Sequence, residues 1–184
     1  ETDKYYIGET FKLALNGKYT VHPNPMVGAV IVKNGKIMGQ GYHLKPGSPH
    51  AEQEAINDAG KSAHNSTLYI NLEPCCHYGR TPPCSDLIIS NKIKRVVVSS
   101  LDPNPIVNGK SIEQLKRSGI EVKIGVLKDD AIKLNQGFFN KFLLKRPAVI
   151  CKSGISLDGK ISLSNGSSKW ITSEESRQDV QMER

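Results

Sequence analysis

The stretch Glu73-Pro74-Cys75-Cys76-His77-Tyr78-Gly79-Arg80-Thr81-Pro82-Pro83-Cys84 decides how this chain is interpreted, together with His50-Ala51-Glu52 upstream. A catalytic zinc ion takes three protein ligands and leaves a fourth position for water. One imidazole, from His50, and two thiolates, from Cys75 and Cys84, make up such a ligand set. The motif therefore predicts one zinc ion per chain.

A carboxylate stands two residues after the histidine. Zinc lowers the pKa of a bound water, and Glu52 is placed to take a proton from that water and deliver it to a ring nitrogen and a departing amine. A His-x-Glu followed by Pro-Cys and a further Cys is the ligand order of zinc-dependent nucleobase deaminases. The residues therefore predict an enzyme that removes an amine from a heterocyclic ring by hydrolysis.

The spacing constrains the geometry of this site. Residues two apart on a helix do not share a face, so His50 and Glu52 converge only if the zinc lies beyond a helix N-terminus. A helix is predicted directly after His50, because an apolar stripe at helical spacing ends at Gly60; the stripe is Ala51, Ala55, Ile56 and Ala59. Pro74 suggests the first turn of a second helix, whose positive end would favour a thiolate at Cys75.

Two simpler interpretations stay open at this point. The four cysteines of the chain are ordinary buried thiols in one of them. The other is a structural zinc site, which needs a fourth protein ligand that Cys76 or His77 could supply. Glu52 favours the catalytic interpretation, because a structural site gives this carboxylate no role.

Composition places the chain among ordinary globular proteins. It has 184 residues, of which 38% are hydrophobic and 23% charged, and its apolar runs are shorter than a membrane span. The first residues lack the basic segment and apolar core of a signal peptide, so we expect a cytoplasmic protein with reduced cysteines and no membrane partner. The net charge is +7, but the basic residues are scattered, so we expect a small phosphorylated substrate and no nucleic acid.

Periodicity and turn residues predict alternating helices and strands. Helices are expected at 4–16, directly after His50, at 86–91, around Ile112 and Leu115, and at 129–144. Strands are expected at 27–33, 37–43, 67–72, 95–100 and 120–124, and Asn34-Gly35 predicts a hairpin between the first two. This order predicts a three-layer α/β/α fold, in which a mixed sheet of five strands is covered by helices on both faces.

Three loops carry candidate substrate contacts. Asn24 is framed by two prolines, and Asn104 follows a buried strand at the edge where open α/β sheets place ligands. His43 closes the second strand on the side that leads to the metal site. His77, Arg80 and His43 are expected within reach of a substrate phosphate, for which arginine is well suited, although Arg80 as a solvated loop charge stays open.

A domain boundary is predicted at Arg146-Pro147, giving domains 1–145 and 146–184. A new strand is expected at 148–152. The second segment is shorter than most chains that fold alone, so it is either part of a larger domain or packs on the first.

The motifs together resemble a known family. Residues 1–145 are similar to the deaminase domain of the bifunctional bacterial riboflavin-biosynthesis deaminase/reductases, in five blocks: Pro23–Val30, Gly41–His43, His50–Glu52, Glu73–Cys84 and Asp102–Pro105. Eight residues separate Cys75 from Cys84, whereas deaminases of tRNA adenosine or free cytidine typically have two. The tail resembles the opening of the reductase domain, at 152–160, 168–172 and 177–184.

The resemblance implies a cytidine-deaminase-like fold and a specific reaction. It is the hydrolysis of 2,5-diamino-6-(ribosylamino)-4(3H)-pyrimidinone 5′-phosphate to 5-amino-6-(ribosylamino)uracil 5′-phosphate and ammonia. It also implies that Gly154, Ser168, Trp170 and Arg184 belong to a nicotinamide-cofactor and substrate site, with NADP bound only by a complete reductase domain. A homo-oligomer is expected. The alternatives are a nucleic-acid (tRNA) base deaminase and a non-enzymatic module stabilised by zinc.

Overall fold

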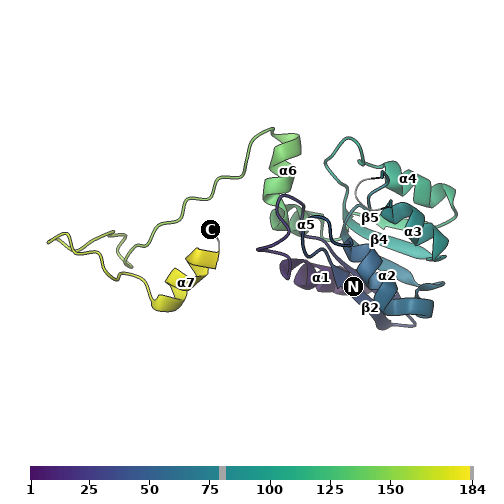
Figure 1. Ribbon diagram of the computed structural model, residues 1–184, viewed down its shortest axis with the longest axis horizontal. Helices are drawn as coiled ribbons and strands as arrows, with labels where there is room; N and C mark the ends of the chain where they lie inside the picture. The colour runs from purple at the N-terminus through teal and green to yellow at the C-terminus, as the bar shows by residue number, and fades with distance from the viewer. Residues whose placement is uncertain (79–81, 183–184) are drawn as a thin grey trace. The chain divides into compact units, whose positions relative to one another are not determined.

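The computed structural model describes residues 1–78 and 82–182 of the chain. The chain separates into two compact units, Glu1–Pro147 and Ala148–Arg184 (Figure 1).

The first unit is built on a five-stranded sheet. Its strands are β1 (Gly28–Lys33), β2 (Lys36–Tyr42), β3 (Thr67–Leu72), β4 (Arg95–Ser100) and β5 (Glu121–Ile124), in the spatial order β2-β1-β3-β4-β5. β1 is antiparallel to both β2 and β3, whereas β3, β4 and β5 are parallel. The turn between β1 and β2 has positive φ at Asn34 (52°) and Gly35 (74°), as a two-residue hairpin requires. The predicted mixed sheet and hairpin are confirmed.

Helices cover both faces of this sheet. They are α1 (Thr2–Leu15), α2 (Ala51–Ala59), the 3₁₀ turn η1 (Gly60–Ala63), α3 (Cys84–Ser90), α4 (Lys110–Arg117), α5 (Lys128–Leu134) and α6 (Gln136–Leu143). Alternate residues of β1 face opposite layers: Ile31 joins a core with residues of α2, α3 and α4, whereas Val30 joins a core with residues of α1 (Figure 1). The predicted three-layer α/β/α fold is therefore confirmed.

Helix α2 approaches β2 so closely that only glycine fits between them. A Cβ added at Gly41 would lie 2.6 Å from both the Ala51 carbonyl oxygen and the Ala55 nitrogen. One added at Gly39 would lie 2.7 Å from the Cβ of Ala59. The small residues that face each other thus fix the depth of α2 on the sheet, and with it the position of the segment that begins the helix.

We expect Gly41→Ala to displace the first turn of α2 and to lower the stability of the fold by about 1–3 kcal/mol, as overpacking of a filled core does. Gly8→Ala is the matched control, because a Cβ at Gly8 meets nothing within 4 Å, and alanine at this helical position should stabilise the protein slightly. Chemical denaturation of both variants measures the difference. Equal stability of Gly41→Ala and wild type would contradict the close-packing argument.

Two predicted helices differ from the structure. No helix starts at Pro74: residues 73–78 are irregular, and α3 begins at Cys84, directly after Pro83. The backbone there pairs with other segments instead, since the Ser85 N–H donates to the Cys75 carbonyl at 3.1 Å. The predicted helix 129–144 is broken at Asn135, whose backbone leaves the helical range (φ −112°, ψ 31°) between α5 and α6.

The second unit contains helix α7 (Glu174–Met182) and a series of turns. The strand expected at 148–152 is wrong: these residues are extended without a ladder, and Val149 and Ile150 are 87% and 84% exposed. Among the residues of this unit that the structure describes, none is buried. A strand needs a neighbour to take up its backbone hydrogen bonds, and no described segment of this unit provides one.

Across 1–78 and 82–182, no helix has both the length and the apolar character that a membrane crossing needs.

Candidate metal centre and active site

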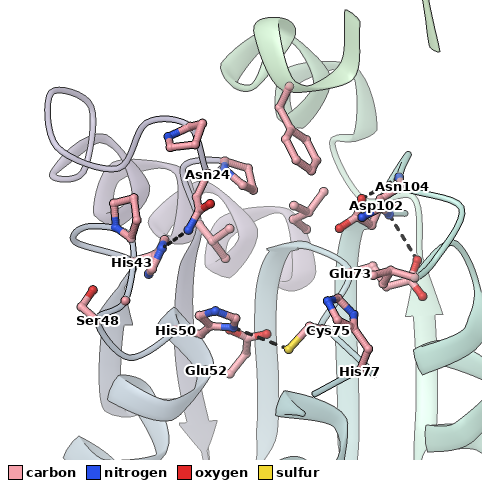
Figure 2. Close-up of a pocket in the computed structure, with 18 residues that line it drawn as sticks. Asn24, His43, Ser48, His50, Glu52, Glu73, Cys75, His77, Asp102 and Asn104 are labelled. Carbon is pink, nitrogen blue, oxygen red and sulfur yellow. Dashed lines mark hydrogen bonds between the residues drawn. The ribbon is translucent and has the colours of Figure 1, made fainter. Parts of the chain in front are cut away.

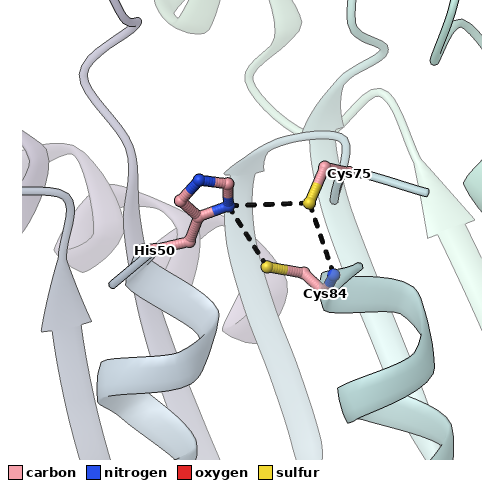
Figure 3. Close-up of side chains that lie close together, drawn as sticks. All are labelled: His50, Cys75 and Cys84. Carbon is pink, nitrogen blue, oxygen red and sulfur yellow. Dashed lines mark hydrogen bonds between the residues drawn. The ribbon is translucent and has the colours of Figure 1, made fainter. Parts of the chain in front are cut away.

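Three side chains from separate segments meet at one end of the sheet. His50 is the residue that precedes α2, with extended backbone angles (φ −77°, ψ 162°), and Cys84 is the first residue of α3. Cys75 lies in the irregular segment after β3 (Figure 3). The start of α2 and the start of α3 therefore converge with the carboxyl end of β3.

The distances within this cluster match a tetrahedral metal site. The Nδ1 atom of His50 lies 3.5 Å from Sγ of Cys75 and 3.3 Å from Sγ of Cys84 (Figure 3). All three ligand atoms lie within 4.8 Å of one another. Zinc bonds of roughly 2.0–2.3 Å at tetrahedral angles place two ligands about 3.5–3.8 Å apart. The two histidine–sulfur distances are close to this spacing, so the three side chains suit one zinc ion.

The two sulfurs are also chemically suited to a divalent cation. The hydrogen bond with Cys84 and then that with His50 lower the pKa of Cys75, and the N–H of Cys84 donates to the Cys75 sulfur at 3.3 Å. The hydrogen bond with Cys75, together with burial, raises the pKa of Cys84. Cys75 is therefore the sulfur that ionises more readily, and a cation that binds both sulfurs requires Cys84 to lose its proton as well.

Glu52 lies in the first turn of α2 and is only 3% exposed. Burial raises the pKa of this carboxyl to about 7, and the negative charge of Cys75 acts in the same direction. A carboxyl group with a pKa near neutrality both accepts and releases protons readily. Its side chain lines the cavity described next, on the side of His50 (Figure 2).

A cavity of about 490 Å³ opens over the cluster, which is a size typical of small-molecule sites. Its walls come from the loop before β1, the loop before α2, the carboxyl ends of β3 and β4, and α6. Its lining includes Asn24, Val27, His43, Ser48, His50, Glu52, Glu73, Cys75, His77, Asp102, Asn104 and Phe138 (Figure 2).

Asn24 and His43 form a pair on one wall. The buried ring of His43 bonds through Nδ1 to the Pro49 carbonyl at 3.0 Å and through Nε2 to Nδ2 of Asn24 at 2.9 Å. The carbonyl can only accept, so Nδ1 carries the proton and Nε2 accepts from the amide. Burial lowers the pKa of His43, which agrees with this neutral ring. The amide oxygen of Asn24 is consequently turned away from His43 (Figure 2).

The opposite wall is held by the buried carboxylate of Glu73. It accepts hydrogen bonds from the N–H of Asp102 (3.2 Å), the N–H of Gly109 (2.9 Å) and the hydroxyl of Ser111 (2.8 Å). Asp102 in turn accepts the N–H of Asn104 at 2.8 Å. Burial raises the pKa of Asp102 to about 6, and the charge of Glu73 contributes. Glu73 therefore fixes the loop that carries Asp102 and Asn104.

Sequence reasoning gave no role to Glu73 or Asp102, although both stand in the motifs quoted above. A signal for them existed: Glu73 directly follows β3, and Asp102 stands two residues after β4. These two strands are parallel neighbours in the sheet, so residues beyond their carboxyl ends lie close together. Ser48 and Phe138 were also missed as cavity residues. Neither has a sequence signature, because each is placed by the packing of its loop or helix.

Most of the predicted substrate contacts meet at this cavity. Asn24, His43, His77 and Asn104 all line it. Arg80 lies outside the described residues. Within the described part of the chain, the converging metal-ligand group consists of His50, Cys75 and Cys84, and neither Cys76 nor His77 belongs to it. This arrangement gives no support to a structural site with a fourth protein ligand.

The residues predicted for a reductase site belong to the second unit. Gly154, Ser168 and Trp170 are exposed, and the guanidinium of Arg177 stacks 4.2 Å from the centre of the Trp170 ring. Arg184 lies outside the described residues. The described part of this unit shows no enclosed site around them, and their roles stay predictions.

Known proteins match both parts of the chain. A family model for the cytidine and deoxycytidylate deaminase zinc-binding region matches residues 1–100, and one for the RibD C-terminal domain matches residues 147–184. The chain is 54% identical to the riboflavin biosynthesis protein RibD of Aquifex aeolicus, covering 96% of this chain and 50% of that protein. It is 52% identical to the diaminohydroxyphosphoribosylamino-pyrimidine deaminase of Buchnera aphidicola, covering 76% of this chain and 95% of that protein.

Solved structures give the same result. RibD of Acinetobacter baumannii, form 1, matches with a TM-score of 0.90 and 48% identity, and the match covers 98% of this chain and 51% of that one. The chain spans about half the length of the RibD proteins that it matches.

The mixed sheet with a histidine and two cysteines at its end defines a zinc-dependent deaminase fold. The chain belongs to the cytidine and deoxycytidylate deaminase family. The resemblance to bifunctional riboflavin-biosynthesis deaminase/reductases that the sequence motifs suggested is confirmed.

We expect one zinc ion per chain, and we expect Cys84→Ala to lose most of it because one of three ligands is removed. Cys76→Ala is the control on an adjacent thiol, and it should retain the full metal content. Elemental analysis after gel filtration measures both. Full zinc in Cys84→Ala, or complete loss in Cys76→Ala, would contradict the ligand assignment.

Proposed function

We propose that the first unit hydrolyses the ring amine of 2,5-diamino-6-(ribosylamino)-4(3H)-pyrimidinone 5′-phosphate, giving 5-amino-6-(ribosylamino)uracil 5′-phosphate and ammonia. One observation carries the proposal: a buried carboxyl, Glu52, lines a cavity sized for a small molecule together with His50 and Cys75, two members of the three-ligand cluster. The deaminase of Buchnera aphidicola, which is matched over nearly its whole length, supports this choice of substrate.

His50, Cys75 and Cys84 would hold the zinc ion. When bound, zinc supplies Lewis acidity that makes water acidic enough to act as a nucleophile near neutral pH. Glu52 removes a proton from the attacking water and passes protons to the ring nitrogen and the leaving amine. Because its carboxyl is buried, its proton affinity is high enough for both directions of transfer.

Substrate recognition is proposed for the two walls of the cavity. The Asn24 amide oxygen, held in place by His43, accepts an N–H or O–H of the substrate. Asn104, held through Asp102 and Glu73, acts from the other side. We retain His77 and Arg80 as the groups proposed for the substrate phosphate. His43 no longer belongs with them, because both of its ring nitrogens are engaged, by Pro49 and by Asn24.

A tRNA base deaminase is the second candidate. A flipped base would also fill a small cavity beside zinc. The eight residues between Cys75 and Cys84 favour the pyrimidine phosphate, since tRNA and cytidine deaminases typically have two. A non-enzymatic zinc module explains neither the cavity nor the buried Glu52.

Ammonia release from the pyrimidine phosphate and from tRNA, measured side by side with the zinc-loaded protein, tests the proposal. We expect turnover of the pyrimidine phosphate only. Release from tRNA alone would favour the second candidate, and no release from either would favour the non-enzymatic module.

We expect Glu52→Gln to retain zinc and fold but to lose about 10⁴-fold in kcat, the upper end for general acid–base groups, because the residue serves more than one proton transfer. Glu54→Gln is the matched control, since Glu54 lies two residues after Glu52 in the first turn of α2 and is not among the cavity residues. Steady-state kinetics with a parallel zinc assay measure both variants. Near-normal turnover of zinc-loaded Glu52→Gln would overturn the mechanism.

Residues 146–184 are proposed to be the first part of a reductase domain, with Gly154, Ser168, Trp170 and Arg184 contributing to its site. The RibD C-terminal model that matches there supports this assignment. NADP binding would then require the remainder of that domain, so we do not expect reduction by these residues alone. A cytoplasmic homo-oligomer without a nucleic-acid or membrane partner completes the proposal.

A further inference from the structure

Two buried amides replace a missing strand partner next to the cavity. The pairing of β1 with β3 stops at Ala29 and Ile70. Beyond it, the side chain of Asn71 accepts the N–H of Gly28 and donates to the carbonyl of Met26, both at 2.9 Å. An amide side chain presents the same donor and acceptor as a peptide group, so Asn71 extends the ladder toward the loop that carries Asn24.

Asn135 holds the same segment from the other side. Its Oδ1 accepts the Met26 N–H at 2.8 Å, and its Nδ2 donates to the Met26 carbonyl at 2.9 Å. The side chain is 5% exposed and reaches across 109 positions of sequence. An asparagine that precedes a helix normally caps that helix, but Asn135 makes no capping hydrogen bond to α6. Both the oxygen and the nitrogen of its amide bond the backbone of Met26 instead.

This bond joins two walls of the cavity. Met26 lies between Asn24 and Val27, which both line the cavity, and Asn135 is followed three residues later by Phe138, which also lines it. The Phe138 ring packs edge-on against Phe142, with ring centres 5.1 Å apart. The Asn135 side chain thus ties the segment that carries Asn24 to the start of the helix that carries Phe138.

We infer that Asn135 is a positioning residue that sets Phe138 as the apolar wall against which the substrate ring packs, opposite the polar groups of Asn24. The inference rests on the proposed function for the identity of the ring. Planar heterocycles gain affinity from contact with an aromatic side chain, and this contact depends on the placement of the ring. Asn135 thus acts on the substrate through Phe138.

Kinetics of ammonia release test the recognition step. Asn135→Ala and Phe138→Leu should each raise KM about tenfold, while kcat and zinc content change little, because the lost interaction serves binding. The double variant should raise KM by clearly less than the product of the two separate factors, since Asn135 acts through Phe138. Gln136→Ala, exposed, adjacent and not among the cavity residues, is the matched control and should leave KM unchanged.

Hydrogen exchange tests, without substrate, whether Asn135 holds the segment around Met26 in place. Asn135→Ala should speed exchange in residues 21–28 of the zinc-loaded protein, and Gln136→Ala should not. Unchanged exchange in Asn135→Ala, an unchanged KM in either Asn135→Ala or Phe138→Leu, or fully multiplicative effects in the double variant would each overturn the inference. A wild-type chain that releases no ammonia from the pyrimidine phosphate would instead refute the proposed function, and the role of Phe138 in binding that ring would fall with it.

Discussion

The close approach of α2 to β2 is the constraint on which the site depends. With glycine at 39 and 41 and alanines facing them, helix and strand meet almost backbone to backbone. The nearest atoms are backbone and Cβ atoms, which cannot move aside as the far end of a side chain could, so a change of spacing is poorly absorbed. The depth of α2 therefore fixes the start of the helix, and the start of the helix fixes both His50 and Glu52. The histidine needs this precision because its two partner sulfurs come from another part of the sheet.

Buried polar side chains hold the loops in place where the hydrogen-bonded pairing of the strands ends. Glu73 anchors the loop after β4, and Asn71 and Asn135 anchor the segment before β1. A buried polar atom without a partner is costly, so each of these groups strongly favours a single arrangement. Among the described residues, no buried side-chain nitrogen or oxygen lacks a hydrogen-bond partner. Loops of irregular backbone thus form precise walls around the cavity.

The sequence predicted what depends on local pattern. The β-rich runs, the Asn34-Gly35 turn and the helical stripe after His50 each depend on neighbouring residues, and the spacing of the metal motif depends on chemistry that recurs among deaminases. It could not predict what depends on distant contacts. The helix expected at Pro74 does not form, and the backbone of Cys75 instead pairs with Ser85 at the start of α3, the helix that was expected at 86–91. The helix expected through Asn135 breaks where its side chain bonds Met26, over 100 positions away.

The groups that bind the metal and transfer protons are acidic, whereas the pair His43 and Asn24 is neutral. Glu52, Cys75 and Cys84 bring acidic groups together in a buried place, and their mutual repulsion is relieved when a divalent cation binds the sulfurs. The adjacent pair of His43 and Asn24 is neutral: His43 shares its single ring proton with a carbonyl and leaves its other nitrogen to orient Asn24. A charged His43 would present two donors and would turn the Asn24 amide around. Burial that keeps this ring neutral therefore preserves the direction of the amide, which we propose contacts the substrate. The metal-binding groups beside it carry the charge that the proposed chemistry needs.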